Sequence, residues 1–342
     1  MYTRPRVHSF HEKLLSIARP VSFLKGARLV RQGEASRGAF VIRSGEAEAQ
    51  VALPGGGTLA VARFGEGEMF GEMALVERGV CTATVVAHSD VDAWFVGRDD
   101  FCAMVASRER SALEIQHAIT RTLADKLRTL NERVKQYPAA EDREARDAPP
   151  AGAIVLPQSG KGSFDWRGFL PVLPFFDGFD EDERNELVAA GRPLELERGA
   201  WVFAAGQPAG ACYLVLRGAL EVFTRNGGKE RRVAIAGPGE LVGFMAVIDA
   251  AARSNNARVR EACCLLELPR AAFLELYNGA SGAAVSLHHA IHRSLLRSIG
   301  RTNTQLTRLL SHARLTAAPK DALELEKALR GQIVQSSSLT ET

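Results

Sequence analysis

Residues 65–75 of the chain read Gly-Glu-Gly-Glu-Met-Phe-Gly-Glu-Met-Ala-Leu, and residues 239–246 read Gly-Glu-Leu-Val-Gly-Phe-Met-Ala. The two segments are 172 residues apart, so that Gly67 matches Gly239 and Gly71 matches Gly243. Glycines that recur in register at one fixed spacing indicate an internal repeat. We therefore expect that one structural unit has been duplicated in this chain.

The repeat extends well beyond these two segments. On the N-terminal side the spacing is 173 residues, and the matched pairs are Arg19-Pro20 with Arg192-Pro193, Gly26 with Gly199, Gly33 with Gly206, and Gly45 with Gly218. On the C-terminal side it is 172 residues, and the pairs include Arg98 with Arg270 and Phe101 with Phe273. The spacing changes by one residue at the Gly-rich segments 54–57 and 226–228. Both segments have the composition of hairpin turns, which tolerate a one-residue difference in loop length. The chain is predicted to contain two copies of one domain in tandem.

Each copy has the pattern of short strands separated by glycine. Residues 40–45 read Phe-Val-Ile-Arg-Ser-Gly and residues 213–218 read Tyr-Leu-Val-Leu-Arg-Gly, and alternating apolar residues follow both. Many short strands with turn signals between them predict an antiparallel barrel or jelly roll. The predicted fold class is mainly β with α: two tandem β-roll or jelly-roll barrels, each flanked by helices and followed by a long helix.

The two long helices are predicted from apolar residues at steps of three and four. The first stripe consists of Ile115, Ile119, Leu123, Leu127, Leu130 and Val134, and the second of Leu287, Ile291, Leu295, Ile299, Leu306 and Leu309. Such a narrow stripe packs on its own barrel or on a partner helix. The sequence leaves both arrangements open.

These patterns divide the chain into four predicted parts. The first domain spans residues 8–137, a linker rich in Pro, Ala, Gly and charge spans 138–163, the second domain spans 164–313, and a polar tail spans 314–342. Linkers of this composition separate domains.

The bulk composition restricts the class of protein. A chain of 342 residues with 46% hydrophobic and 24% charged residues is typical of a soluble globular protein. The net charge of +3 gives no general argument for nucleic acid or an anionic membrane as a partner. No apolar run approaches the roughly 20 residues that cross a bilayer. Five sparse cysteines indicate reduced thiols, so a cytoplasmic location is expected.

The segment 65–75, continued by Thr82-Ala83-Thr84-Val85, resembles the phosphate-binding cassette of cyclic-nucleotide-binding domains, as in catabolite activator proteins and protein kinase A regulatory subunits. The resemblance covers nearly the whole chain, twice. It implies a short helix within the barrel whose free N–H groups face the ligand phosphate. It also implies a glutamate that binds the ribose hydroxyl and, nine residues later, an arginine that pairs with the phosphate.

Carried over residue by residue, the resemblance implies one incomplete site in each copy. The ligand-binding residues of the first are Gly71, Glu72, Met73, Ala74, Thr82 and Thr84, with Cys81 where the arginine belongs. Those of the second are Gly243, Phe244, Met245, Ala246, Arg253 and Ser254, with Phe244 where the glutamate belongs. A charge-assisted contact contributes about 1.5–3 kcal/mol, so its loss weakens binding by about ten- to hundredfold.

No set of catalytic or metal-binding residues emerges from the sequence. Of the eight histidines, His88 alone lies in a barrel segment, and the cassette lacks the Lys and Ser/Thr of a nucleotide-hydrolysing P-loop. Only about 30 residues follow the last helix, fewer than a helix-turn-helix domain with its own core needs. We therefore expect no enzyme, no metal, no DNA partner and no membrane partner.

The leading hypothesis is a non-catalytic regulatory or sensor protein. A cyclic nucleotide or related anionic small molecule is the expected ligand, with no other cofactor. Its binding would be relayed through the long helices to a protein partner, and a homodimer through one helix stripe is consistent with this pattern. Two alternatives stay open: a scaffold whose pockets bind no nucleotide, and a transcription regulator of the catabolite-activator type.

Overall fold

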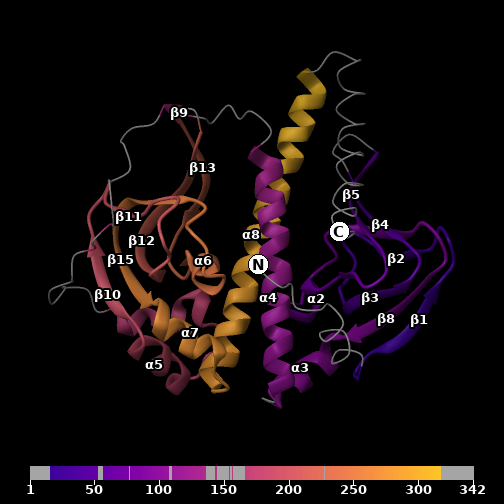
Figure 1. Cartoon of the computed structure of the whole chain (residues 1–342), viewed down its shortest axis with the longest axis horizontal. Coiled ribbons are helices and arrows are strands. Elements are labelled where there is room, and N and C mark those ends of the chain that lie inside the picture. The colour runs from indigo at the N-terminus through magenta and orange to yellow at the C-terminus, as the bar shows by residue number, and fades with distance from the viewer. Residues whose placement is uncertain are drawn as a thin grey trace. The chain divides into compact units, whose positions relative to one another are not determined.

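The computed structural model describes residues 16–52, 57–76, 78–107, 110–135, 143–144, 154, 156, 166–226 and 228–316 (Figure 1). Residues 8–15 of the predicted first domain, most of the predicted linker and nearly all of the predicted tail lie outside these ranges. The chain divides into two compact units, one formed by Met1–Val134 with Leu296–Thr342 and the other by Lys135–Leu295. The boundaries predicted from the sequence stay a prediction.

The first unit contains two four-stranded antiparallel sheets that share one core. Their strand orders are β1-β8-β3-β6 and β2-β7-β4-β5. The strands are β1 (Arg19–Phe23), β2 (Arg28–Val30), β3 (Gly38–Ser44), β4 (Ala47–Ala52), β5 (Thr58–Phe64), β6 (Met69–Phe70), β7 (Thr84–Ala87) and β8 (Val91–Gly97). Buried side chains from both sheets pack together, among them Phe40 and Phe70, whose rings stack at 5.0 Å. The predicted β-roll is confirmed.

The second unit repeats this fold with longer, less interrupted strands. They are β10 (Arg192–Leu196), β11 (Trp201–Phe203), β12 (Ala211–Asn226), β13 (Lys229–Ala236), β14 (Leu241–Val242) and β15 (Asn256–Pro269). Strand β12 covers the positions of β3 and β4, and β15 those of β7 and β8. A further strand, β9 (Arg143–Glu144), pairs with the edge of β13, so part of the segment predicted as linker belongs to this sheet.

Helices lie at matching places in the two units. In the first they are α2 (Met73–Val76), α3 (Arg98–Ala106) and α4 (Arg110–Lys135). Those of the second half of the chain are η1 (Arg167–Val172), η2 (Pro174–Phe176), α5 (Glu181–Ala189), α6 (Phe244–Ile248), α7 (Arg270–Asn278) and α8 (Gly282–Thr316). Both predicted long helices are confirmed as α4 and α8, and the boundary between the two units falls inside α8.

Most residues of the two apolar stripes are buried within the single chain, whereas Leu130 and Leu309 are half-buried. Ile115, Ile119 and Leu123 of α4 have no exposed surface, and Leu287 and Ile291 of α8 have none either. A protein partner or a second copy would therefore reach these residues only after the helices had moved.

One glycine of each repeat stands where a side chain has no room. Gly45 and Gly218 have φ angles of 88° and 83°, in the left-handed region. A Cβ atom on Gly45 would lie 2.1 Å from the carbonyl oxygen of Asp90, and one on Gly218 would lie 2.4 Å from that of Ala262. The same close approach of two backbone segments in both copies explains why these glycines stay in register.

Adjacent cysteines on β15 serve as core residues. The side chains of Cys263 and Cys264 are 2% and 1% exposed. Burial raises the pKa of the Cys263 thiol to about 12 and that of Cys264 to about 11. Both remain protonated near neutral pH and fill space as small apolar groups.

A buried carboxylate on β4 makes the first unit sensitive to acid. Glu48 accepts hydrogen bonds from Gln50 (2.9 Å) and Arg63 (3.2 Å), and its Oε2 lies 3.4 Å from Nε2 of His88. Burial raises the pKa of Glu48, but these hydrogen bonds and the charges of His88 and Arg63 lower it more, so the pKa lies below its ordinary value.

We predict that Glu48→Gln changes the pH dependence of unfolding. A lowered carboxyl pKa stabilises the fold above the unfolded-state pKa of about 4.3, and this contribution is lost as the pH falls through the folded-state pKa. The difference in unfolding free energy between wild type and variant should narrow between about pH 6 and pH 3. Urea denaturation at several pH values measures it, with the exposed Glu46→Gln as the control. A difference that stays constant with pH would contradict the prediction.

Candidate cyclic-nucleotide site

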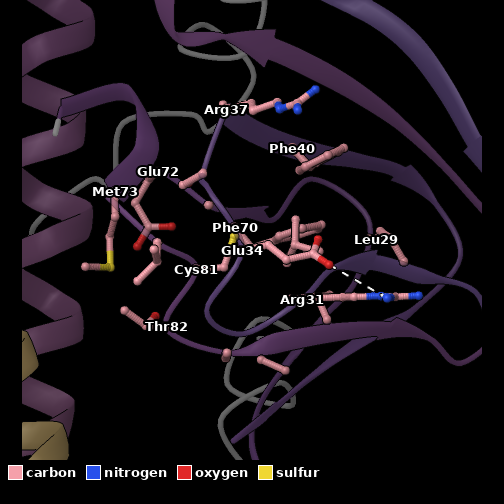
Figure 2. Close-up of a pocket in the computed structure, with 18 of the residues that line it drawn as sticks. Leu29, Arg31, Glu34, Arg37, Phe40, Phe70, Glu72, Met73, Cys81 and Thr82 are labelled. Carbon is pink, nitrogen blue, oxygen red and sulfur yellow. Dashed lines mark ion pairs between the residues drawn. The ribbon is translucent and has the colours of Figure 1, made fainter. Parts of the chain in front are cut away.

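A cavity of about 640 Å³ opens in the first unit beside the cassette segment (Figure 2). Much of its wall is apolar and includes Leu29, Phe40 and Phe70. Figure 2 shows Glu72, Met73, Cys81 and Thr82 gathered on the side nearest the long helix, and Leu29 and Arg31 on the opposite side. A largely apolar cavity with a few polar groups in its wall is typical of a small-molecule site.

Four of the six residues predicted for the first site line this cavity: Gly71, Glu72, Met73 and Thr82. The other two do not. Ala74 is buried behind the cavity, and its carbonyl oxygen accepts a hydrogen bond from Nη1 of Arg98 at 3.1 Å. Thr84 lies in β7, where its Oγ1 accepts a hydrogen bond from the backbone N–H of Gln32 at 3.1 Å.

The carboxylate at the centre of the predicted site is bound by the long helix. Oε1 of Glu72 lies 2.8 Å from Nζ of Lys126, which is on α4 and also lines the cavity. Glu72 is 2% exposed, whereas the Lys126 side chain is 40% exposed. Sequence reasoning did not identify Lys126, because the two residues are 54 positions apart and no local motif connects them.

Cys81 and Arg253 occupy the same position in the two copies. Each exchanges a pair of backbone hydrogen bonds with a loop of its own unit, which follows β2 in the first unit and β11 in the second. The four bonds are Gly33 N to Cys81 O (2.8 Å), Cys81 N to Glu34 O (2.8 Å), Gly206 N to Arg253 O (2.8 Å) and Arg253 N to Gln207 O (2.9 Å). The backbone at residue 81 is therefore held as it is at residue 253, and only the side chain differs.

In the second unit the arginine folds onto its own cassette. Arg253 is 5% exposed, and Nη1 donates to the carbonyl oxygen of Gly243 at 2.7 Å while Nη2 donates to that of Ala211. Its guanidinium carbon lies 4.3 Å from the ring centroid of Phe203. Burial lowers the pKa of Arg253. Within the described residues Nε of this side chain is buried without a hydrogen-bond partner.

The other residues predicted for the second site lie at the start of α6 or on the loop after it. Phe244 is buried, Met245 and Ala246 are half-buried, and Ser254 is exposed. Gly243 has a φ angle of 81°, and a Cβ atom there would lie 2.5 Å from Nη1 of Arg253. The glycine thus leaves room for the guanidinium.

The sequence model of the cyclic nucleotide-binding domain matches residues 20–108 and 193–279, which together exceed half of the chain. The chain belongs to the cyclic nucleotide-binding domain family. The tandem cyclic-nucleotide-binding domains predicted from the repeat are thereby confirmed.

The chain is similar to regulatory members of this family. It is 36% identical to the cyclic AMP receptor protein of Thermus thermophilus over 104 residues, which are 30% of this chain and 48% of that protein. It is 30% identical over 79 residues to a cAMP-dependent protein kinase regulatory subunit of Colletotrichum orbiculare, covering 23% of this chain and 19% of that one. The solved regulatory domain of Toxoplasma gondii PKA with cAMP is 21% identical, with a TM-score of 0.31, over 82% of this chain and 87% of that one.

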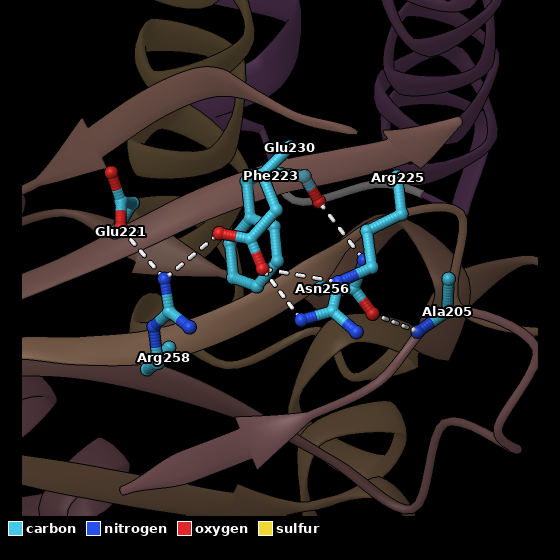
Figure 3. A network of polar contacts seen from close by, with 7 residues as sticks. All are labelled: Ala205, Glu221, Phe223, Arg225, Glu230, Asn256 and Arg258. Atoms are coloured by element: carbon cyan, nitrogen blue, oxygen red, sulfur yellow. Dashed lines mark hydrogen bonds and ion pairs between the residues drawn. The ribbon is translucent and has the colours of Figure 1, made fainter. Parts of the chain in front are cut away.

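The second cyclic nucleotide-binding domain also contains a polar network (Figure 3). Arg258 of β15 pairs with Glu230 of β13 at 3.1 Å and with Glu221 of β12 at 3.4 Å. Glu230 also pairs with Arg225 at 2.6 Å. The network links three strands. We interpret it as structural, because two of the pairs join strands that are neighbours in the sheet, and the third, Arg258 with Glu230, connects β15 to β13 across β12.

Neither a metal-binding cluster nor a membrane-spanning helix occurs among the described residues. Within them, no three His, Cys, Asp or Glu side chains lie close enough together to bind a metal ion. None of the helices in this part of the chain is long and apolar enough to span a membrane.

Proposed function

We propose that this chain is a non-catalytic sensor whose first domain binds a cyclic nucleotide or a related anionic small molecule and relays its presence to a protein partner through α4. The observation that carries the proposal is the cavity of the first domain, which is lined by cassette residues and by Lys126 of the long helix.

The composition of the cavity suits such a ligand. Its volume of about 640 Å³ falls within the range of small-molecule sites, about 300–1,000 Å³. The aromatic wall formed by Phe40 and Phe70 offers apolar contact area, and the buried Glu72 offers an acceptor for a ligand hydroxyl. A hydroxyl that donates to a carboxylate makes a stronger hydrogen bond than one between neutral groups.

The contact between Glu72 and Lys126 gives a route from the cavity to the helix. A ligand that binds Glu72 changes the partner of Lys126, and so the free energy that holds α4 in its present position. A ligand shifts a conformational equilibrium only by as much as its affinities for the two states differ. Breaking or remaking this ion pair supplies such a difference.

The second domain would bind its ligand differently. There, Arg253 is the group for the anion, beside Gly243, Phe244, Met245, Ala246 and Ser254. An incoming phosphate would have to replace the carbonyl oxygens of Gly243 and Ala211 as partner of the guanidinium. With Phe244 in place of a glutamate, this site lacks an acceptor for the ribose hydroxyl.

Isothermal titration calorimetry of the full chain with cyclic AMP, cyclic GMP and cyclic dinucleotides tests the proposal. We expect binding of at least one of these ligands, weakened about tenfold by Glu72→Gln, because a charge-assisted hydrogen bond is replaced by a neutral one. The exposed Glu66→Gln is the matched control and should bind as the wild type does. Hydrogen exchange of residues 110–135 should change when the ligand binds.

Two outcomes would overturn the proposal. If no ligand produces heat or raises the melting temperature, the scaffold alternative is favoured. If the chain instead binds duplex DNA with the steep salt dependence of phosphate contacts, the transcription-regulator alternative is favoured.

A further inference from the structure

The first domain lacks a cation at position 81 but holds one in the same cavity from another element. Cys81 and Lys126 both line the cavity, and Nζ of Lys126 lies 2.8 Å from the buried carboxylate of Glu72. The thiol at position 81 carries no positive charge with which to pair with an anion. The positive charge next to the cassette therefore comes from α4, not from the cassette itself.

We infer that Lys126 supplies the positive charge for the anionic group of the ligand, and that the Glu72–Lys126 pair selects ligands with a hydroxyl next to a phosphate-type anion. This inference rests on the proposed function and specifies the ligand chemistry of the same cavity. Lys126 would act as a specificity-determining residue that no cassette motif contains.

The geometry of the pair supports this assignment. The two charged atoms are separated by the length of an ordinary hydrogen bond, so a hydroxyl and an anionic oxygen that lie a few bonds apart on one ligand can reach both at once. The hydroxyl would donate to Glu72, while the anionic oxygen would accept from Lys126. An ammonium group has three donors, so Lys126 has donors for the anionic oxygen of the ligand besides the one it gives to Glu72 in the structure.

The other cations of the cavity are less suited to this role. Arg31 pairs with Glu34 at 3.7 Å, and both side chains are more than half exposed. Arg37 is also exposed. Figure 2 draws Arg31 across the cavity from Glu72. Charges in open contact with water are screened by salt, whereas a partly buried ion pair is screened much less.

The two domains differ in the element that carries the cation. In the second domain the cation, Arg253, belongs to the loop after the cassette helix. In the first domain it belongs to the long helix itself. Ligand binding in the first domain would thus act on α4 directly through its own side chain, without an intermediate movement of the cassette.

The test is calorimetry of the full chain with cyclic AMP and with 2′-deoxy cyclic AMP. The binding step that Glu72→Gln weakens belongs to the first domain. In that step, Lys126→Met should lower the affinity for cyclic AMP by about tenfold, the loss of one partly exposed charged contact. Arg121→Met, on an exposed position of the same helix, is the matched control and should stay within twofold of the wild type. The 2′-deoxy ligand should bind more weakly than cyclic AMP.

A second variant distinguishes a loss of affinity from a loss of folding. Lys126→Met leaves the buried Glu72 without its partner, which can destabilise the domain. Lys126→Gln keeps an N–H donor for Glu72 but removes the charge, so it should fold and still lose affinity. If the wild type binds no cyclic nucleotide, the proposed function fails and this inference with it. If the wild type binds and both Lys126 variants bind equally well, the inference alone is overturned.

Discussion

The substitution Cys81→Arg is expected to strengthen binding of cyclic AMP to the first domain by about ten- to hundredfold, because one charge-assisted contact to a phosphate contributes about 1.5–3 kcal/mol. The backbone at Cys81 makes the same pair of hydrogen bonds as the backbone at Arg253 in the second domain. Cys81 also lines the cavity. An arginine there would start from the position that the second domain already uses, and its planar guanidinium binds phosphate through two N–H groups.

Calorimetry with cyclic AMP measures this gain, and Cys102→Arg provides the control. Cys102 is exposed on α3, so an arginine there adds the same charge without entering the cavity. In the Lys126→Met background, Cys81→Arg should restore the affinity that the loss of Lys126 removes. An affinity that rises equally in both arginine variants would mean that only the net charge matters, and the prediction would be wrong.

The duplication could be predicted from sequence because its markers are local. Gly71 and Gly243 have φ angles of 76° and 81°, and Gly45 and Gly218 also lie in the left-handed region. Few other residues adopt this conformation without strain, so each copy keeps a glycine at these positions whatever surrounds it. The apolar steps of the long helices are likewise a property of the local chain.

The partners of the site residues could not be predicted, because they depend on contacts between distant segments. Nothing near Glu72 in the sequence indicates that Lys126 of α4 reaches it. Nothing near Arg253 indicates that its guanidinium donates to the backbone oxygens of Gly243 and Ala211. The pairing of the two-residue strand β9 with β13 could not be predicted either, because the sequence around β9 has the composition of a linker.

The same distinction explains the two predicted site residues that do not line the cavity. Motif matching places Ala74 and Thr84 within the cassette by their position in the sequence alone. In the structure the backbone carbonyl of Ala74 accepts a hydrogen bond from Arg98, and the hydroxyl of Thr84 accepts one from the backbone of Gln32. A motif specifies the backbone path here more closely than it specifies which side chains face the ligand.

The substitution Gly45→Ala is expected to destabilise the first domain by about 2–5 kcal/mol. The left-handed φ angle of 88° costs a residue with a Cβ atom about 1–2 kcal/mol. The new Cβ atom would also lie 2.1 Å from the carbonyl oxygen of Asp90, which is backbone and cannot rotate away. The strands must shift to relieve this overlap, and overpacking of this kind costs about 1–3 kcal/mol more.

Gly26→Ala separates the two contributions, because the two glycines have similar φ angles but differ in the space available to a Cβ atom. Gly26 has a φ angle of 83° but open space where its Cβ atom would lie. It should therefore cost only the backbone contribution, about 1–2 kcal/mol, as measured by urea denaturation of each variant. Equal losses of unfolding free energy in the two variants would mean that the backbone segments at Gly45 and Asp90 can separate enough to accommodate a Cβ atom. The recurrence of glycine at Gly218 would then reflect the φ angle alone, and not the close contact of two strands that both repeats preserve.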